Sequence, residues 1–128
     1  TTMKKLSLIF ALCSFFAFAL TANTIVENSI ETTINIQKLK TVTFKVYGNC
    51  SMCKTTIEKS LKGVKGIAAA TWDVDKKMIT VTYNPKKVEL LDIHNKIAAV
   101  GYDTDIVKAK DNVYDNLHGC CQYERPKS

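Results

Sequence analysis

The amino-acid sequence predicts an α+β fold, in which two helices cover one face of a four-stranded antiparallel sheet. Two observations lead to this expectation. Short runs of alternating apolar and polar residues have the period of half-buried strands, and two longer segments place apolar residues three or four positions apart, as helices with one buried face do. Over residues 41–107 these segments follow the order β-α-β-β-α-β, which is the order of the ferredoxin-like fold.

The first strand and the first helix are predicted on either side of a cysteine motif. In residues 41–47 the apolar side chains alternate with polar ones, at Val42, Phe44 and Val46. The helix that follows is predicted from a single apolar face, which carries Cys53, Ile57, Leu61 and Val64. Gly63 and Gly66 are expected to end this helix, because glycine is favoured just past a helix C-terminus.

An antiparallel hairpin is predicted next. Residues 67–74 and 78–83 are both rich in side chains that favour strands, and residues 75–77 supply a short polar connection. Pro85 closes the second strand of the pair, because proline cannot donate a hydrogen bond to a ladder. Trp72 is expected in the core between the sheet and the helices.

A second helix and a last strand complete the predicted domain. The helix is expected from an apolar face made by Leu90, Ile93, Ile97 and Val100. Gly101 stands where a glycine that ends a helix belongs. His94 lies beside this face and is expected at its boundary or in solvent, and residues 102–107 are the predicted fourth strand.

The motif Cys50-Ser51-Met52-Cys53 carries the functional prediction. Two cysteines separated by two residues at the first turn of a helix point the same way and can converge on one ion. The positive end of the helix dipole, together with Lys54, favours the thiolate form that binds metals. Thiolates select soft ions such as Cu(I) and Zn(II) over magnesium or calcium. We therefore predict one soft-metal site at Cys50 and Cys53.

The N-terminal part of the chain is predicted to lie outside the fold. Residues 1–22 have the pattern of a secretory signal peptide, since Lys4 and Lys5 precede an almost wholly apolar run at residues 6–20. This run is shorter than the roughly 20 residues that a membrane-spanning helix needs. A periplasmic or secreted protein, without stable membrane insertion after cleavage, is therefore expected. Residues 23–40 are predicted to be a leader or tether.

Charge and size limit the remaining possibilities. The formal net charge is +6, and the basic residues are spread along the chain without a cluster that interleaves with aromatic side chains. A nucleic-acid partner is therefore not expected. Once a signal peptide is removed, the chain has the size of one small domain with a single core.

Residues 108–128 are predicted to form a C-terminal extension. Asp111 is expected to cap a short helix that ends at Gly119, and the adjacent cysteines Cys120 and Cys121 follow. Neighbouring cysteines rarely form a relaxed disulfide with each other, because the preferred Cα separation of about 5.5 Å exceeds the spacing of about 3.8 Å between neighbours. With His118 they could form an auxiliary metal site. A disulfide to the main cysteine pair and a dimer-forming thiol are the alternatives.

Several motifs recur together over the predicted domain: the Cys-x-x-Cys between the first strand and first helix, and the segments 63–67, 74–75, 80–85 and 99–103. As a set they resemble the heavy-metal-associated domain family, which includes copper chaperones, modules of copper-transporting ATPases and the mercury-binding periplasmic protein. The resemblance covers residues 41–107. It implies that Cys50 and Cys53 are the metal ligands and that Tyr102 lies near the metal loop, where it either shields the ion or packs on the helices.

The sequence departs from this family in one place. The family usually has Gly-Met-x-Cys before its first ligand, and Tyr47-Gly48-Asn49 occupies the corresponding positions here. The methionine that normally supports the loop is therefore missing, and loop rigidity and metal preference are the properties affected. Met52, between the two cysteines, is expected either to pack in its place or to be exposed.

The leading functional hypothesis is a non-enzymatic metal carrier. It would bind Cu(I), or Hg(II), Zn(II) or Cd(II), and pass the ion to a metal-transporting membrane protein or another thiol metal carrier, as a monomer or a metal-bridged dimer. The alternative is a thiol-disulfide oxidoreductase that uses the same Cys-x-x-Cys. The hairpin directly after the first helix argues against this alternative, and a protein held only by structural disulfides is the third class considered.

Overall fold

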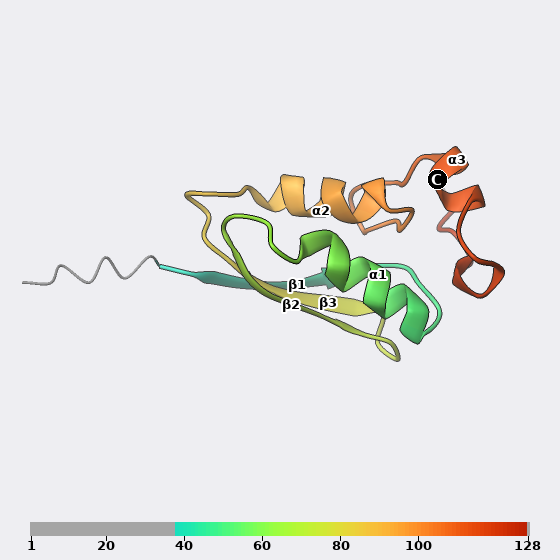
Figure 1. The fold of residues 1–128 in the computed structure, drawn as a ribbon, viewed down its shortest axis with the longest axis horizontal. Helices are drawn as coiled ribbons and strands as arrows, with labels where there is room; N and C mark the ends of the chain where they lie inside the picture. The colour runs from blue at the N-terminus through green and yellow to red at the C-terminus, as the bar shows by residue number, and fades with distance from the viewer. Residues whose placement is uncertain (1–37, 128) are drawn as a thin grey trace, which may run out of the picture. The chain divides into compact units, whose positions relative to one another are not determined.

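The computed structural model describes residues 38–127. Its elements are β1 (Lys40–Lys45), α1 (Ser51–Leu61), β2 (Ile67–Asp73), β3 (Met78–Tyr83), α2 (Leu90–Ala99), α3 (Asp111–Asp115) and the 3₁₀ helix η1 (Gly119–Cys121). The helices α1 and α2 lie on the same face of the sheet (Figure 1). This confirms the predicted α+β class with two helices on an antiparallel sheet. The predicted signal peptide, and the leader as far as residue 37, lie outside the described residues.

The sheet in the described part of the chain has the strand order β1-β3-β2, and both pairings are antiparallel. The side chains of Phe44, Trp72, Ile79 and Val81 are buried on the helix side. On the other face, threonine hydroxyls form two cross-strand hydrogen bonds, Thr41 with Thr82 at 3.0 Å and Thr43 with Thr80 at 3.1 Å. The alternation in residues 41–47 and the hairpin of β2 and β3 are thus as predicted.

The predicted fourth strand is present only as one isolated bridge, between Val46 and Thr104. The backbone N–H of Asp105 donates to the carbonyl of Lys45, but the chain then turns. The Thr104 Oγ1 accepts hydrogen bonds from the N–H groups of Ile106 and Val107, and the Thr104 N–H donates to the Val107 carbonyl. A threonine side chain that binds the local backbone in this way competes with a sheet ladder. Pairing along β1 therefore stops at this bridge.

Both predicted helices pack through the expected faces. Cys53, Ile57 and Leu61 of α1 are fully buried, and Gly63 follows the end of the helix with a φ of +77°.

None of the helices in residues 38–127 has the length and apolar character needed to span a bilayer.

The expectation for His94 of α2 was wrong, because this side chain is buried. Its ring stacks on Phe44 at a centroid distance of 3.8 Å, and its Nδ1 lies 2.8 Å from the Thr104 hydroxyl. Burial lowers the pKa of His94, while Asp105 partly opposes that effect. The imidazole is therefore a neutral member of the core that helps to hold the turn at Thr104.

The segment after residue 107 packs against the domain and contributes to its core. Cys121 and Tyr123 are buried, and the Tyr123 ring faces Tyr102, Tyr47 and Tyr114. Asp111 does not cap α3 as expected. It is the first residue of the helix, Lys110 occupies the cap position, and the Asp111 carboxylate pairs with Arg125 at 2.7 Å.

Replacement of Ile57 by alanine is expected to lower the free energy of unfolding by about 2 to 5 kcal/mol, because it leaves a cavity between α1 and the sheet. Ile57 is fully buried, whereas Lys59, two residues along the same helix, is exposed. Urea unfolding followed by circular dichroism measures the change. Lys59→Ala is the control and should change stability by no more than about 0.5 kcal/mol. Equal effects of the two substitutions would contradict this packing.

Candidate metal centre

Cys50 and Cys53 stand at the start of α1, where the loop from β1 enters the helix. Cys50 is the cap residue, with an extended backbone, and Cys53 lies in the first turn. Their Sγ atoms are 3.6 Å apart. Cys53 is fully buried, and its Sγ accepts the N–H of Asn49 at 3.3 Å, whereas Cys50 is partly exposed. The sequence motif therefore places two thiols side by side, one of them accessible from outside.

The loop before Cys50 packs closely on Trp72, although it lacks the methionine typical of the family that the sequence resembles. A Cβ atom on Gly48 would lie 3.0 Å from the Trp72 ring and 3.3 Å from the Cβ of Cys53, so a larger residue does not fit without a shift. The Trp72 Nε1 donates to the Val46 carbonyl at 3.1 Å. Trp72 thus supplies the support, and Met52, which is 47% exposed, does not pack in its place.

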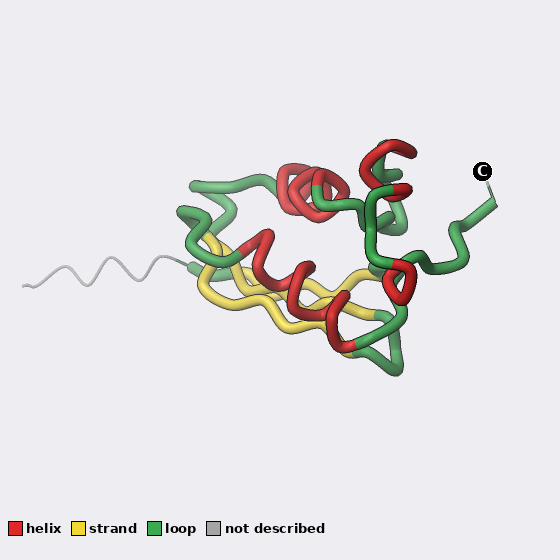
Figure 2. Tube along the Cα trace, turned by 45° about the vertical axis from the view of Figure 1, so that its right-hand side comes forward, coloured by secondary structure: helices red, strands yellow, loops and turns green. Residues whose placement is uncertain are grey.

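A third thiol reaches the pair from the C-terminal part of the chain. The Sγ of Cys121, in η1, lies 4.0 Å from that of Cys50, and the Sγ atoms of Cys50, Cys53 and Cys121 all lie within 4.8 Å of one another. Figure 2 shows the short η1 helix beside the first turn of α1. Within residues 38–127, this is the group of three side chains placed to hold a metal ion.

The other two residues of the predicted auxiliary site are arranged differently. Cys120 is exposed, with its Sγ 3.9 Å from that of Cys121, and His118 is exposed. Neither belongs to the three-thiol group. All four described cysteines are free thiols, and Cys121 joins the main pair. Nothing local in the sequence indicates this approach, because 71 positions separate Cys50 from Cys121.

The thiols of Cys50 and Cys121 differ in how readily they ionise. The N–H of Cys53 is the main cause that lowers the pKa of Cys50 from 9.0 to about 7; burial opposes it, and the Cys53 thiol and the Met52 N–H contribute. Burial raises the pKa of Cys121 to about 12, and the Cys53 thiol adds to that effect. At neutral pH, a large fraction of Cys50 is therefore thiolate, while Cys121 holds its proton. An ion that binds Cys121 must release this proton.

Tyr102 forms the inner wall of the thiol group. Its side chain is fully buried, and its hydroxyl has no hydrogen-bond partner in the described part of the chain. Burial raises its pKa, with further contributions from the neighbouring thiols of Cys121 and Cys53. Tyr102 is thus a core residue beside the thiols of Cys53 and Cys121, as the packing interpretation expects.

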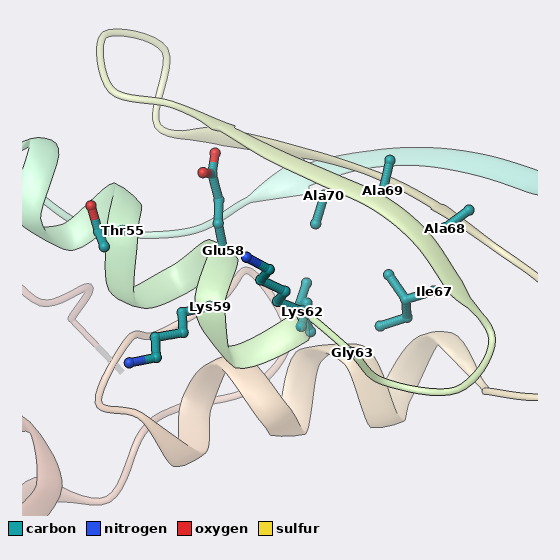
Figure 3. A pocket seen from close by; sticks show the side chains of 10 residues that line it. Thr55, Glu58, Lys59, Lys62, Gly63, Ile67, Ala68, Ala69 and Ala70 are labelled. Atoms are coloured by element: carbon teal, nitrogen blue, oxygen red, sulfur yellow. The ribbon is translucent and has the colours of Figure 1, made fainter.

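A pocket of about 500 Å³ lies away from the cysteines, between α1 and β2 (Figure 3). Its lining includes Glu58 and Lys59 of α1 and Ala70 of β2. The Glu58 carboxylate already binds the Lys54 ammonium and accepts the Trp72 N–H at 2.8 Å. No cysteine or histidine lines this pocket, so it is not part of the metal centre.

Alkylation should reveal the difference in ionisation. In metal-free, reduced protein, the rate at which iodoacetamide modifies Cys50 is expected to rise with pH to a midpoint of about 7, since the lowered pKa makes thiolate available above that value. Cys121 should stay nearly unmodified up to pH 9 because its pKa is about 12. Peptide mass spectrometry follows each site. A Cys50 midpoint near 9 would contradict the assigned hydrogen bonds.

Known proteins resemble this chain in the region just described. The profile of the heavy-metal-associated domain matches residues 43–103. A zinc-transporting ATPase from Synechocystis sp. is 42% identical over 81 residues, which make up 62% of this chain and 11% of the ATPase. A copper chaperone CopZ from Staphylococcus epidermidis is 32% identical over 60 residues, which make up 46% of this chain and 88% of the chaperone.

A solved structure shares the fold. The N-terminal domain of a potential copper-translocating P-type ATPase from Bacillus subtilis, in its Cu(I)-loaded state, aligns with a TM-score of 0.51 at 27% identity, over 59% of this chain and 96% of that chain. The chain spans only about a tenth of the Synechocystis ATPase but nearly the whole of the chaperone. On this coverage and on the match of its domain profile, the chain belongs to the heavy-metal-associated domain family.

Proposed function

We propose that this protein carries a soft metal ion, Cu(I) in the first place, on the thiolates of Cys50 and Cys53 and passes it to a second thiol protein. The observation that supports this most directly is the pair of Sγ atoms 3.6 Å apart at the start of α1. The first-turn N–H groups lower the pKa of Cys50 to about 7, so a thiolate is available at neutral pH.

The thiol donors also fit Hg(II), Zn(II) and Cd(II), because all of these ions accept thiolate ligands. The names of the relatives include both a copper chaperone and a zinc-transporting ATPase. We place Cu(I) first because Cys50 and Cys53 form a two-thiolate pair, whereas structural zinc usually has four ligands.

Transfer would proceed by exchange of thiolates, without a catalysed reaction. A thiolate of the partner approaches from the side of Cys50, which is partly exposed, and forms a bond to the ion before the bond to Cys50 breaks. Cys53 is buried and would release the ion last. The partner in this proposal is a metal-transporting membrane protein or another thiol metal carrier, and the carrier acts as a monomer or as a metal-bridged dimer.

We also propose that the protein works in the periplasm or outside the cell. The support is the signal-peptide pattern of residues 1–22, which precedes the described residues. An oxidising compartment favours a disulfide between neighbouring cysteines. A bound ion would protect Cys50 and Cys53 there, so metal loading and protection from oxidation would be linked.

A thiol-disulfide oxidoreductase remains the second candidate, because the lowered pKa of Cys50 would suit that chemistry too. The order of elements supports the carrier instead, since the β2–β3 hairpin directly follows α1. An insulin-reduction assay separates the two functions. The carrier should show no turnover in this assay, whereas sustained turnover would favour the enzyme.

Cys50→Ser and Cys53→Ser are each expected to weaken Cu(I) binding by at least about a hundredfold, because even the loss of a group that only hydrogen-bonds to a ligand costs about 10- to 100-fold. Anaerobic competition with a colorimetric Cu(I) chelator measures the affinity. Cys120→Ser, at an exposed cysteine, is the matched control and should bind as the wild type does.

Thermal unfolding of the same variants checks that folding is intact, which matters most for Cys53 because this residue is part of the core. Unchanged affinity in both folded variants, Cys50→Ser and Cys53→Ser, would refute the proposed carrier.

A further inference from the structure

The spacing of the three sulfur atoms fits one ion with three ligands. An ion with metal–sulfur distances of about 2.3 Å, at the centre of three thiolates in one plane, keeps its sulfur atoms about 4.0 Å apart. Two thiolates on opposite sides of the same ion would lie about 4.6 Å apart. The observed separations are 3.6 Å for Cys50 with Cys53 and 4.0 Å for Cys50 with Cys121, and all three sulfur atoms lie within 4.8 Å of one another.

The C-terminal segment is anchored directly after Cys121. The side-chain amide of Asn49, in the metal loop, donates to the Gln122 carbonyl at 3.2 Å. The Tyr123 hydroxyl donates to the Gly101 carbonyl at 3.0 Å and accepts the Asp103 N–H at 2.7 Å. These bonds join the segment directly to the loop before Cys50 and to the chain beside Tyr102.

Arg125 adds a second, charged anchor. Its guanidinium donates to both oxygens of the buried Asp103 carboxylate, at 2.7 and 2.8 Å, and to the Ala109 carbonyl at 2.6 Å. Burial alone would raise the pKa of Asp103, but the Arg125 guanidinium and the Ala109 N–H hold that pKa below its usual value. Asp103 is therefore a carboxylate, and paired hydrogen bonds of this kind fix both position and orientation.

We propose that Cys121 is the third ligand of the ion, and that residues 119–125 are the arm that supplies it. This inference rests on the proposed function, since it assumes that Cys50 and Cys53 bind the same ion. The residue next to Cys121 cannot replace it, because Cys120 is exposed and lies outside the three-thiol group. The cargo is then a soft ion that accepts three thiolates, with Cys53 and Cys121 on its buried side and Cys50 on its exposed side.

The arm changes how the ion leaves. A partner thiolate forms one metal–sulfur bond while the bond from the ion to Cys121 breaks, and the Cys121 thiolate then takes up a proton from water. The oxidation state of the ion does not change. Cys121 therefore increases retention while the arm is docked. Its departure leaves the ion on Cys50 and Cys53 and frees one coordination position for the thiolate that approaches from the side of Cys50.

X-ray absorption on the Cu(I)-loaded full chain tests the third ligand. We expect three sulfur neighbours in the wild type and in Cys120→Ser, but two in Cys121→Ser. The same anaerobic competition should show Cu(I) bound about tenfold more weakly, or weaker still, in Cys121→Ser, with Cys120→Ser unchanged. Cys121→Ala and a thermal melt of each variant guard against misfolding, because Cys121 is buried.

Two sulfur neighbours in the wild type, or equal affinities of the wild type and Cys121→Ser, would overturn the third ligand. The proposed carrier would still stand if Cys50→Ser and Cys53→Ser lost binding in the same experiment. If these two variants instead bound Cu(I) as the wild type does, the carrier itself would fail. Weaker Cu(I) binding in Cys120→Ser alone would make Cys120, and not Cys121, the third ligand and would also overturn the inference.

Arg125→Gln tests the arm without removing a sulfur atom. We expect Cu(I) to move to a competing chelator up to about tenfold faster, because the variant loses charge-assisted hydrogen bonds that keep Cys121 in place. Lys127→Gln removes a positive charge from an exposed residue two positions along and should leave the rate unchanged. Equal rates in Arg125→Gln and the wild type would show that the arm does not govern release.

Discussion

The structure depends on the buried Trp72 side chain, around which the sheet, the first helix and the metal loop are assembled. Its ring fills the space beneath Gly48, and its Nε1 donates to the Val46 carbonyl. The main chain of the same residue is bound by α1: the Glu58 carboxylate accepts the Trp72 N–H, and the Lys54 ammonium donates to its carbonyl. One residue of β2 thus fixes the loop, the start of the helix and their distance from the sheet.

The parts of the fold that follow from local patterns could be predicted from the sequence. A period of two needs only a strand with one buried face, so the alternation in residues 41–47 and the β2–β3 hairpin were predictable. The two cysteines of the motif were predictable because a cap residue and a first-turn residue of the same helix point the same way. The burial of His94 was predicted wrongly, although its spacing of four residues after Leu90 and three before Ile97 places it on the apolar face.

What could not be predicted depends on competition between local and distant contacts. Residues 102–107, the predicted fourth strand, pair with the sheet through one isolated bridge. The Thr104 hydroxyl accepts hydrogen bonds from two backbone N–H groups that would otherwise be available to a ladder. The third thiol could not be found for a different reason. The approach of Cys121 to Cys50 depends on Tyr123 and Arg125 docking at Asp103, and no periodicity in a sequence specifies such a contact.

A site that carries an ion must hold it and also release it, and the two requirements compete. A buried set of ligands holds well because displacement by an incoming ligand is slow, whereas an open pair exchanges easily. In the carrier proposed above, the two properties would reside in different parts of the chain. Cys50 and Cys53 belong to a loop and helix that Trp72 supports, while Cys121 belongs to a short segment fixed by hydrogen bonds, by two ion pairs of Arg125 and by the buried Tyr123 ring. In the proposed carrier, retention would change with the position of that segment, while Trp72 keeps its hydrogen bond to the metal loop.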